Sequence, residues 1–190
     1  MIANYPSEPE KENTLELIKS SIRTVPNWPK KGVMFRDITT LLKESEMFGK
    51  AIELLALRYE NCQIDVIAGV EARGFVIGAA LANALKRGFV PIRKAGKLPA
   101  DAVNIEYELE YGRSKIEVHK DAIYPGCKVL LVDDLIATGG TALAACELIN
   151  KCSGEVFECC FIVDLPNLGG KRKLEDAGFR AHSLVAFEGE

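Results

Sequence analysis

The sequence lacks the features of a secreted, membrane-bound or nucleic-acid-binding protein. No apolar run approaches the ~18 residues that a membrane span needs, and the first thirty residues carry four glutamates where a signal peptide would have its apolar core. No lysine/arginine block stands out, and the formal net charge is −3. We therefore expect a cytoplasmic protein without a membrane or nucleic-acid partner, whose basic groups serve a small anionic ligand.

Cysteine and histidine are too sparsely placed to predict a protein-held metal centre. The chain has two histidines and six cysteines, and no two cysteines form a C-x-x-C pair. The interpretation is a set of reduced, partly buried thiols.

A length of 190 residues, with 48% hydrophobic and 27% charged residues, is typical of one globular domain that forms its core without disulfides. We expect residues 1–11 to form a loose tail. A helix should follow, with an N-cap at Asn13 or Thr14. The proline- and glycine-containing segment Val25–Asp37 reads as an ordered loop.

From residue 64 onwards, short apolar strands alternate with helical patterns. Such alternation predicts an α/β domain with a mostly parallel central sheet flanked by helices on both faces. Residues 98–120 are polar, contain aromatics and have no helical period, so we expect an extended hairpin that stands off the sheet. The expected strands are Ile64–Val70, Phe89–Arg93, Val129–Asp133, Val156–Val163 and an edge strand at Ser183–Phe187.

The segment from Val129 to Thr141 is the most informative in the chain, because ligands of open parallel sheets bind beyond the carboxyl ends of the strands. Here an apolar strand ends in Asp133 and Asp134, and a short loop then leads into a helix. Small residues and a helix N-terminus suit a phosphate group, since backbone N–H groups can converge on it. The loop residues are Ala137, Thr138, Gly139, Gly140 and Thr141.

The two aspartates need a separate explanation, because carboxylates repel phosphate. They suit ribose hydroxyls, which donate hydrogen bonds, and a developing positive charge. Together with the loop they predict a ribose 5-phosphate site. A merely capped helix start with solvated acids is the alternative; a Walker-type loop is excluded because no Gly-Lys-Thr/Ser follows the glycines.

This segment resembles the phosphoribosyl diphosphate motif of the type I phosphoribosyltransferases. The resemblance implies that family's fold, with a mobile β-hairpin lid at 98–120 and a small N-terminal hood at 24–40. It also implies a homodimer that transfers a phosphoribosyl group from 5-phosphoribosyl 1-diphosphate to a nitrogen base. Mg²⁺ would be carried mainly by the substrate, with no firm protein ligands.

Basic residues after two other strands would hold the diphosphate. Arg93, Lys94 and Lys97 form one cluster, and Arg73 and Gly74 open a helix. Solvated surface lysines are the alternative interpretation. The resemblance also implies a cis peptide bond at Glu71–Ala72, although the family commonly has Asp-Ser there, and Ala95 replaces a commonly basic residue.

Three further segments resemble the adenine-accepting members of the family, namely Pro29–Ile38, Arg93–Pro99 and Tyr107–Gly112. Phe35 and Leu135 would enclose the purine ring, the backbone of Met34 would read its edge, and Arg36 would border it; an aromatic that only packs the loop is the alternative. Adenine would thus become AMP. A site for another base, or a silent regulator of the same fold, stays open.

The catalytic residues implied by the resemblance lie on the hairpin and the acidic pair. Glu110, which precedes Tyr111 and Gly112, would exchange a proton with the base. Glu106 and Glu108 compete for this role, and all three acids could form a solvated face. Asp133 and Asp134 would orient the ribose and stabilise its positive charge.

Overall fold

The computed structural model describes residues 6–109 and 112–189, and in this part of the chain a seven-stranded sheet forms the centre. The strand order is β5-β6-β4-β3-β7-β8-β9. Strands β4, β3, β7, β8 and β9 run parallel, and β5 and β6 are antiparallel. Their bounds are Val66–Val70 for β3, Gly88–Lys94 for β4, Ala102–Leu109 for β5, Gly112–His119 for β6, Lys128–Ile136 for β7, Glu155–Asp164 for β8 and Ala181–Ala186 for β9.

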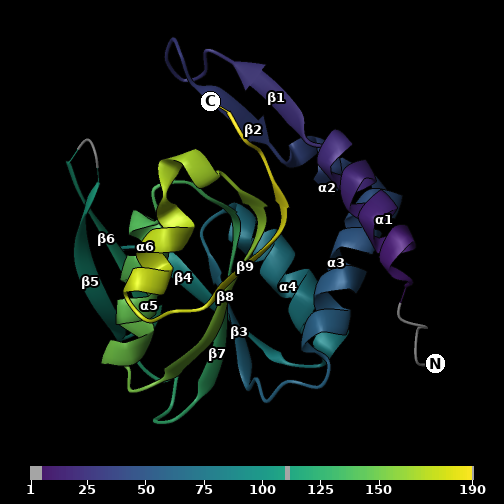
Figure 1. Cartoon of the computed structure of the whole chain (residues 1–190). Helices are drawn as coiled ribbons and strands as arrows, with labels where there is room; N and C mark the ends of the chain where they lie inside the picture. Colours follow the sequence, from purple (N-terminus) through teal and green to yellow (C-terminus); the bar gives the residue numbers. More distant parts are fainter. Residues whose placement is uncertain (1–5, 110–111, 190) are drawn as a thin grey trace.

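Helices cover both faces of this sheet, which confirms the expected α/β architecture (Figure 1). Helices α5 and α6 lie on one face, and α1, α3 and α4 lie on the other. None of the helices within the described ranges has the length and hydrophobicity of a membrane span. The helices are α1 Glu8–Ser20, α2 Thr39–Lys43, α3 Ser45–Tyr59, α4 Arg73–Leu85, α5 Gly140–Lys151 and α6 Gly170–Asp176, with a 3₁₀ turn at Pro166–Leu168.

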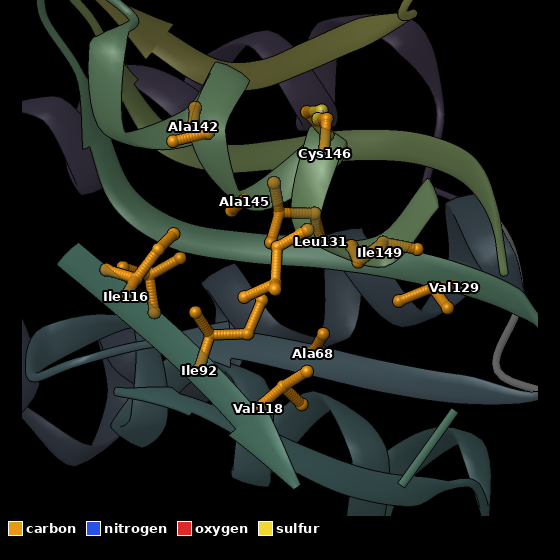
Figure 2. Packing of buried hydrophobic residues seen from close by; sticks show 14 of the residues in the cluster. Ala68, Ile92, Ile116, Val118, Val129, Leu131, Ala142, Ala145, Cys146 and Ile149 are labelled. Carbon is orange, nitrogen blue, oxygen red and sulfur yellow. Dashed lines mark hydrogen bonds between the residues drawn. The ribbon is translucent and has the colours of Figure 1, made fainter. Parts of the chain in front are cut away.

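The continuous apolar run of β7 supplies two cores, because successive side chains of a strand point to opposite faces. Val129 and Leu131 belong to the cluster beneath α5, and Leu130 and Val132 to the cluster beneath α3 and α4. All four are fully buried. Figure 2 shows Leu131 beside Ala145 and Val129 beside Ile149, both of α5. The strand without polar alternation thus lies inside the sheet, between β3 and β8, with both faces covered.

Helix α1 begins earlier than the sequence pattern indicated. Ser7 is the N-cap, and its backbone N–H donates to Glu10 Oε2 at 2.8 Å in a capping box. The predicted N-cap at Asn13 or Thr14 is wrong, and residues 8–11 are helical where a loose tail was expected. The S-x-x-E pattern at residues 7–10 is the signal that could have located this start.

The segment expected to be a single ordered loop is a two-stranded hairpin. Strands β1 (Arg23–Pro26) and β2 (Met34–Asp37) pair antiparallel beside the main sheet. Asn27 adopts a positive φ of 60° in the turn, and its side chain accepts from Gly32 N–H at 3.0 Å. The prolines stand at the end of β1 and in the turn, where no ladder hydrogen bond is needed, so they do not prevent the pairing.

The hairpin expected at 98–120 is present as β5 and β6, but its base does not stand off the sheet. Strand β6 pairs with β4 through Arg93↔Glu117 and Lys94↔Ile116. The hairpin therefore continues the sheet at its base, and its outer part extends beyond β4 (Figure 1).

Candidate active site

A cleft opens at the carboxyl ends of β3, β4 and β7. It has a volume of about 280 Å³, and a neighbouring cavity of about 200 Å³ shares Arg73, Asp133 and Asp134 with it. The cleft brings together most of the residues expected to bind diphosphate, and the neighbouring cavity contains the whole loop Ala137–Thr141. We call Ala137–Thr141 the glycine–threonine loop.

The two aspartates lie inside β7 and not at its end as expected, because the strand continues to Ile136. Asp134 is buried, with 4% exposure, and forms an ion pair with Arg73. Asp133 accepts a hydrogen bond from the Asp134 N–H at 2.9 Å. Burial, together with the neighbouring negative charge of Asp134, raises the pKa of the Asp133 carboxyl well above its usual range. Hydroxyl donors or a cation beside Asp133 would favour its charged form.

The glycine–threonine loop packs against the start of α6. Gly139 adopts a positive φ of 75°, and a Cβ there would lie 2.8 Å from the Gly170 carbonyl oxygen. The Gly170 N–H donates to the Ala137 carbonyl at 2.9 Å. Sequence analysis missed Gly170; the pair Gly169–Gly170 was the available signal.

Tyr107 of β5 connects the hairpin to this loop. Its hydroxyl lies 3.3 Å from Thr141 Oγ1, and both residues line the cleft. Tyr107 was predicted only as part of the 98–120 segment, because a tyrosine in a polar hairpin carries no local mark of such a contact.

The basic cluster expected after β4 is present, and Glu71 lies at its centre. Lys97 Nζ is 2.6 Å from Glu71 Oε1, and Arg93 Nε is 3.2 Å from Glu71 Oε2. The Lys97 and Arg93 hydrogen bonds lower the pKa of Glu71 to about 2. Lys94 donates its backbone N–H to the same carboxylate at 3.3 Å and leaves its side chain exposed. The Glu71–Ala72 peptide bond is cis, as the resemblance implied.

Gly74 allows α4 to start directly against the middle of β7, at Val132 and Asp133. A Cβ on Gly74 would lie 2.7 Å from the Val132 carbonyl oxygen and 2.9 Å from Asp133 Oδ1. This close approach places Arg73, the first residue of α4, within reach of Asp134.

The β1–β2 hairpin approaches the cleft through Phe35. The Arg73 guanidinium lies 5.9 Å from the centre of the Phe35 ring. Trp28 packs against the same ring in a T-shaped contact, with centroids 4.3 Å apart; sequence analysis did not identify this tryptophan. Leu135 lines the smaller cavity.

Comparison with known proteins places the chain in a family. A family model described as "Phosphoribosyl transferase domain" matches residues 37–180. An adenine phosphoribosyltransferase of Chlorobium phaeovibrioides is 61% identical, covering 91% of this chain and 99% of the relative; one of Rhizobium johnstonii is 54% identical, covering 93% and 98%. The chain belongs to the adenine phosphoribosyltransferase family.

Solved structures agree with this membership. A crystal structure of the adenine phosphoribosyltransferase of Thermoanaerobacter pseudethanolicus has a TM-score of 0.87 and 48% identity, covering 91% of this chain and 99% of that one. The Saccharomyces cerevisiae enzyme, complexed with an imino-altritol bisphosphate and adenine, has a TM-score of 0.87 and 38% identity, covering 92% and 99%. The expected type I phosphoribosyltransferase fold is therefore confirmed.

Within this adenine phosphoribosyltransferase family fold, two of the predicted residues lie outside the described part of the chain. These are Glu110 and Tyr111. Arg36 is described, but its guanidinium donates to Thr24 and lies 4.4 Å over the Phe187 ring. Its role beside a base stays a prediction.

The described residues contain no group of three or more histidine, cysteine or acidic side chains that could hold a metal ion. In an adenine phosphoribosyltransferase of this construction, a metal would need oxygen ligands from the substrate as well.

Proposed function

We propose that the protein transfers the phosphoribosyl group of 5-phosphoribosyl 1-diphosphate to adenine, giving AMP and diphosphate, as a purine-salvage enzyme. One observation carries this proposal. The acidic pair Asp133 and Asp134 lies between the glycine–threonine loop and the basic cluster around Arg93, along two cavities that share residues. 5-Phosphoribosyl 1-diphosphate requires this order of groups: amide donors for the 5-phosphate, carboxylates for the ribose hydroxyls, and cations for the diphosphate.

The glycine–threonine loop would bind the 5-phosphate. Backbone N–H groups of the loop and of the first turn of α5 can donate to its oxygens, and the helix N-terminus adds partial positive charge. The hydroxyls of Thr138 and Thr141 would add two donors. Asp133 and Asp134 would accept hydrogen bonds from the ribose hydroxyls next to it.

The diphosphate would bind across the cleft. Arg93, Lys94 and Lys97 would supply cationic donors from the β4 side, and Arg73 with the Gly74 backbone from the start of α4. The exposed side chain of Lys94 supports this assignment, because it can reach an entering diphosphate without leaving a carboxylate partner in the described structure.

Adenine would bind between Phe35 and Leu135. Arg36 would border it through its backbone, because its guanidinium contacts Thr24 and Phe187. The Met34 backbone would accept from the 6-amino group and donate to the ring nitrogen beside it. A 6-oxo purine reverses that donor and acceptor, which would leave both backbone groups unpaired, and such mismatches can discriminate by ~10⁴-fold.

The reaction would be a substitution at the ribose C1 carbon. The bond from C1 to the diphosphate oxygen breaks while a bond from C1 to the purine nitrogen forms, and the acidic pair stabilises the positive charge that develops on the sugar. Glu110 would take the imidazole proton that the purine loses. The 98–120 lid, to which Tyr111 belongs by sequence, would exclude water. The Tyr107–Thr141 contact supports the position of β5 beside the glycine–threonine loop.

The donor set of the cleft fits Mg²⁺ bound together with the substrate. Asp133 is a carboxylate whose charged form is disfavoured by burial and by Asp134, and a nearby cation would compensate for both effects. Asp133 could contribute one ligand, while water and substrate oxygens would complete the shell. The bound ion would neutralise charge on the departing diphosphate.

We further propose a homodimer in the cytoplasm, on the strength of the family resemblance and of the thiol-rich composition. Light scattering should give twice the chain mass of 20.8 kDa. A concentration-independent monomer would contradict the dimer.

The proposed activity can be tested by incubating the protein with Mg²⁺, 5-phosphoribosyl 1-diphosphate and each of adenine, hypoxanthine, guanine and xanthine. Chromatography should identify AMP as the main product. Formation of another nucleotide at a comparable rate would show that adenine is not the preferred base. Binding of 5-phosphoribosyl 1-diphosphate without any nucleotide product would favour a regulator.

The role of Glu110 predicts a separable kinetic effect. Glu110→Gln should lower kcat by about 10²-fold, because the amide cannot accept the base proton, while KM for both substrates changes little. Glu106→Gln is the matched control, since Glu106 forms a long 3.8 Å ion pair with Lys115 on the exposed hairpin. Equal turnover in the Glu110 variant and the wild type would refute the assignment.

A further inference from the structure

Arg36 of the β1–β2 hairpin contacts the C-terminal segment of the chain. Figure 1 shows the C-terminus beside β1 and β2. Arg36 Nη2 donates to the Gly189 carbonyl at 3.4 Å, and the guanidinium carbon lies 4.4 Å from the centre of the Phe187 ring. We call Phe187–Gly189 the C-terminal strap.

The polar partners of Arg36 in the described structure are neutral. Its guanidinium donates to the Thr24 hydroxyl and the Gly189 carbonyl, and no ion pair with a carboxylate accompanies them within residues 6–109 and 112–189. Its Nε is buried without a hydrogen-bond partner. The face of the Phe187 ring also lies against the guanidinium, in a cation–π contact at short range.

The strap is anchored to the main sheet. The Phe187 N–H donates to the Asp164 carbonyl at 3.0 Å, at the end of β8, and Phe187 packs against the core beneath α3 and α4. The ring of Phe187 is thus fixed relative to the sheet whose strand ends form the cleft.

Arg36 shares strand β2 with the proposed base-binding residues Met34 and Phe35. Successive side chains of β2 point to opposite faces; Phe35 contacts Trp28 and Arg73, whereas Arg36 contacts the strap. Holding the Arg36 guanidinium therefore holds the backbone of β2, which carries Met34 and Phe35.

We propose that Phe187 is a positioning residue for base binding, which holds β2 at a set distance from the cleft through Arg36. The inference rests on the proposed function, because it takes Met34 and Phe35 as the adenine contacts. Phe187 itself does not touch the reacting atoms. Its loss should weaken the binding of adenine and spare that of 5-phosphoribosyl 1-diphosphate, whose groups lie on the main sheet and its helices.

The kinetic test is Phe187→Leu, which keeps a large apolar side chain and removes the ring face. KM for adenine should rise about fivefold, the factor that corresponds to about 1 kcal/mol of cation–π energy, with KM for 5-phosphoribosyl 1-diphosphate and kcat within about twofold. Phe187→Tyr should restore the wild-type value, because the ring face is retained.

Lys19→Met is the matched control. Lys19 Nζ lies 5.5 Å from the same ring but belongs to α1, not to the hairpin, so its removal should leave both KM values unchanged. An equal rise of both KM values in Phe187→Leu, or no rise in that for adenine, would overturn the proposal.

Hydrogen exchange of the full-length protein separates this inference from the proposed function. Amides of residues 23–37 should exchange faster in Phe187→Leu than in the wild type or in Lys19→Met, whatever base is accepted. Unchanged exchange would show that the strap does not hold the hairpin. If exchange is faster in Phe187→Leu but the wild-type protein makes no AMP, the inference about the strap stands and the proposed function is refuted.

Discussion

Glu71 changes how the basic cluster should be understood, at the scale of a single residue. Its carboxylate accepts from Lys97 and from Arg93, two of the three cations expected to bind diphosphate after β4. Because its pKa is lowered to about 2, the carboxylate is ionised at every pH at which the enzyme would be assayed. An entering diphosphate must compete with it for both cations.

This competition gives a prediction for Glu71→Gln. The neutral amide should lower the Kd for diphosphate in the presence of Mg²⁺ by about threefold, since half-exposed ion pairs contribute up to about 1 kcal/mol. Titration calorimetry measures it. A group with a depressed folded pKa is charged above that pKa, so the difference from the wild type should be constant from pH 6 to pH 8. A raised Kd would show that Glu71 positions the cations instead of competing for them.

At the scale of elements, the glycine–threonine loop depends on a close approach between its backbone and the first residue of α6. A Cβ on Gly170 would lie 2.6 Å from the Gly139 nitrogen and would also overlap the Ala137 carbonyl. Backbone atoms cannot move aside as a flexible side chain can. The loop conformation therefore depends on α6, which follows the loop in the chain only after α5 and β8.

Gly170→Ala should accordingly impair the binding of 5-phosphoribosyl 1-diphosphate. We expect its KM to rise about tenfold or more, because displaced N–H groups lose charge-assisted hydrogen bonds of about 1.5–3 kcal/mol each. Initial-rate kinetics with adenine at saturation measure this change. Gly49→Ala in α3 is the control, since a Cβ there meets nothing within 4 Å and alanine favours a helix. Equal KM values for the two variants would contradict the prediction.

At the scale of the whole molecule, a buried carboxylate joins α3 to the sheet. Glu158 of β8 is 5% exposed and accepts from Arg58 Nε at 3.0 Å and from the Tyr59 hydroxyl at 2.6 Å, both of α3. This network lies on the α3 face of the sheet, at the level of Leu130 of β7, and not at the strand ends that form the cleft. It contributes to stability without contacting the candidate site.

Glu158→Gln should lower the free energy of unfolding by about 2 kcal/mol, because one of the two acceptor oxygens becomes a donor and the negative charge is lost while the Arg58 charge stays. Urea denaturation measures this, and KM values should not change. Glu46→Gln removes the exposed ion pair with Lys50 and should change the stability by about 0.5 kcal/mol at most. If Glu158→Gln lost as little stability as Glu46→Gln, water would be replacing the hydrogen bonds that the Glu158 carboxylate makes.

The alternation of strands and helices from residue 64 onwards, and the burial of β7 on both faces, could be predicted because they depend on residues close together in the sequence. The same holds for the position of the glycine–threonine loop after β7. The start of α1 was missed although its capping box is local. The β1–β2 pairing was missed because four-residue strands between prolines carry too short a pattern to be distinguished from a loop.

The contacts that complete the candidate site were decided by the tertiary structure. Glu71 and Lys97 are 26 residues apart, and Arg36 and Gly189 are 153 apart. Whether a carboxylate faces a cation, or an arginine faces a ring, depends on how distant segments pack together, and no local periodicity specifies this. The residue types at the site were determined by the sequence alone, and their partners by the fold, because side-chain chemistry is local and spatial proximity is not.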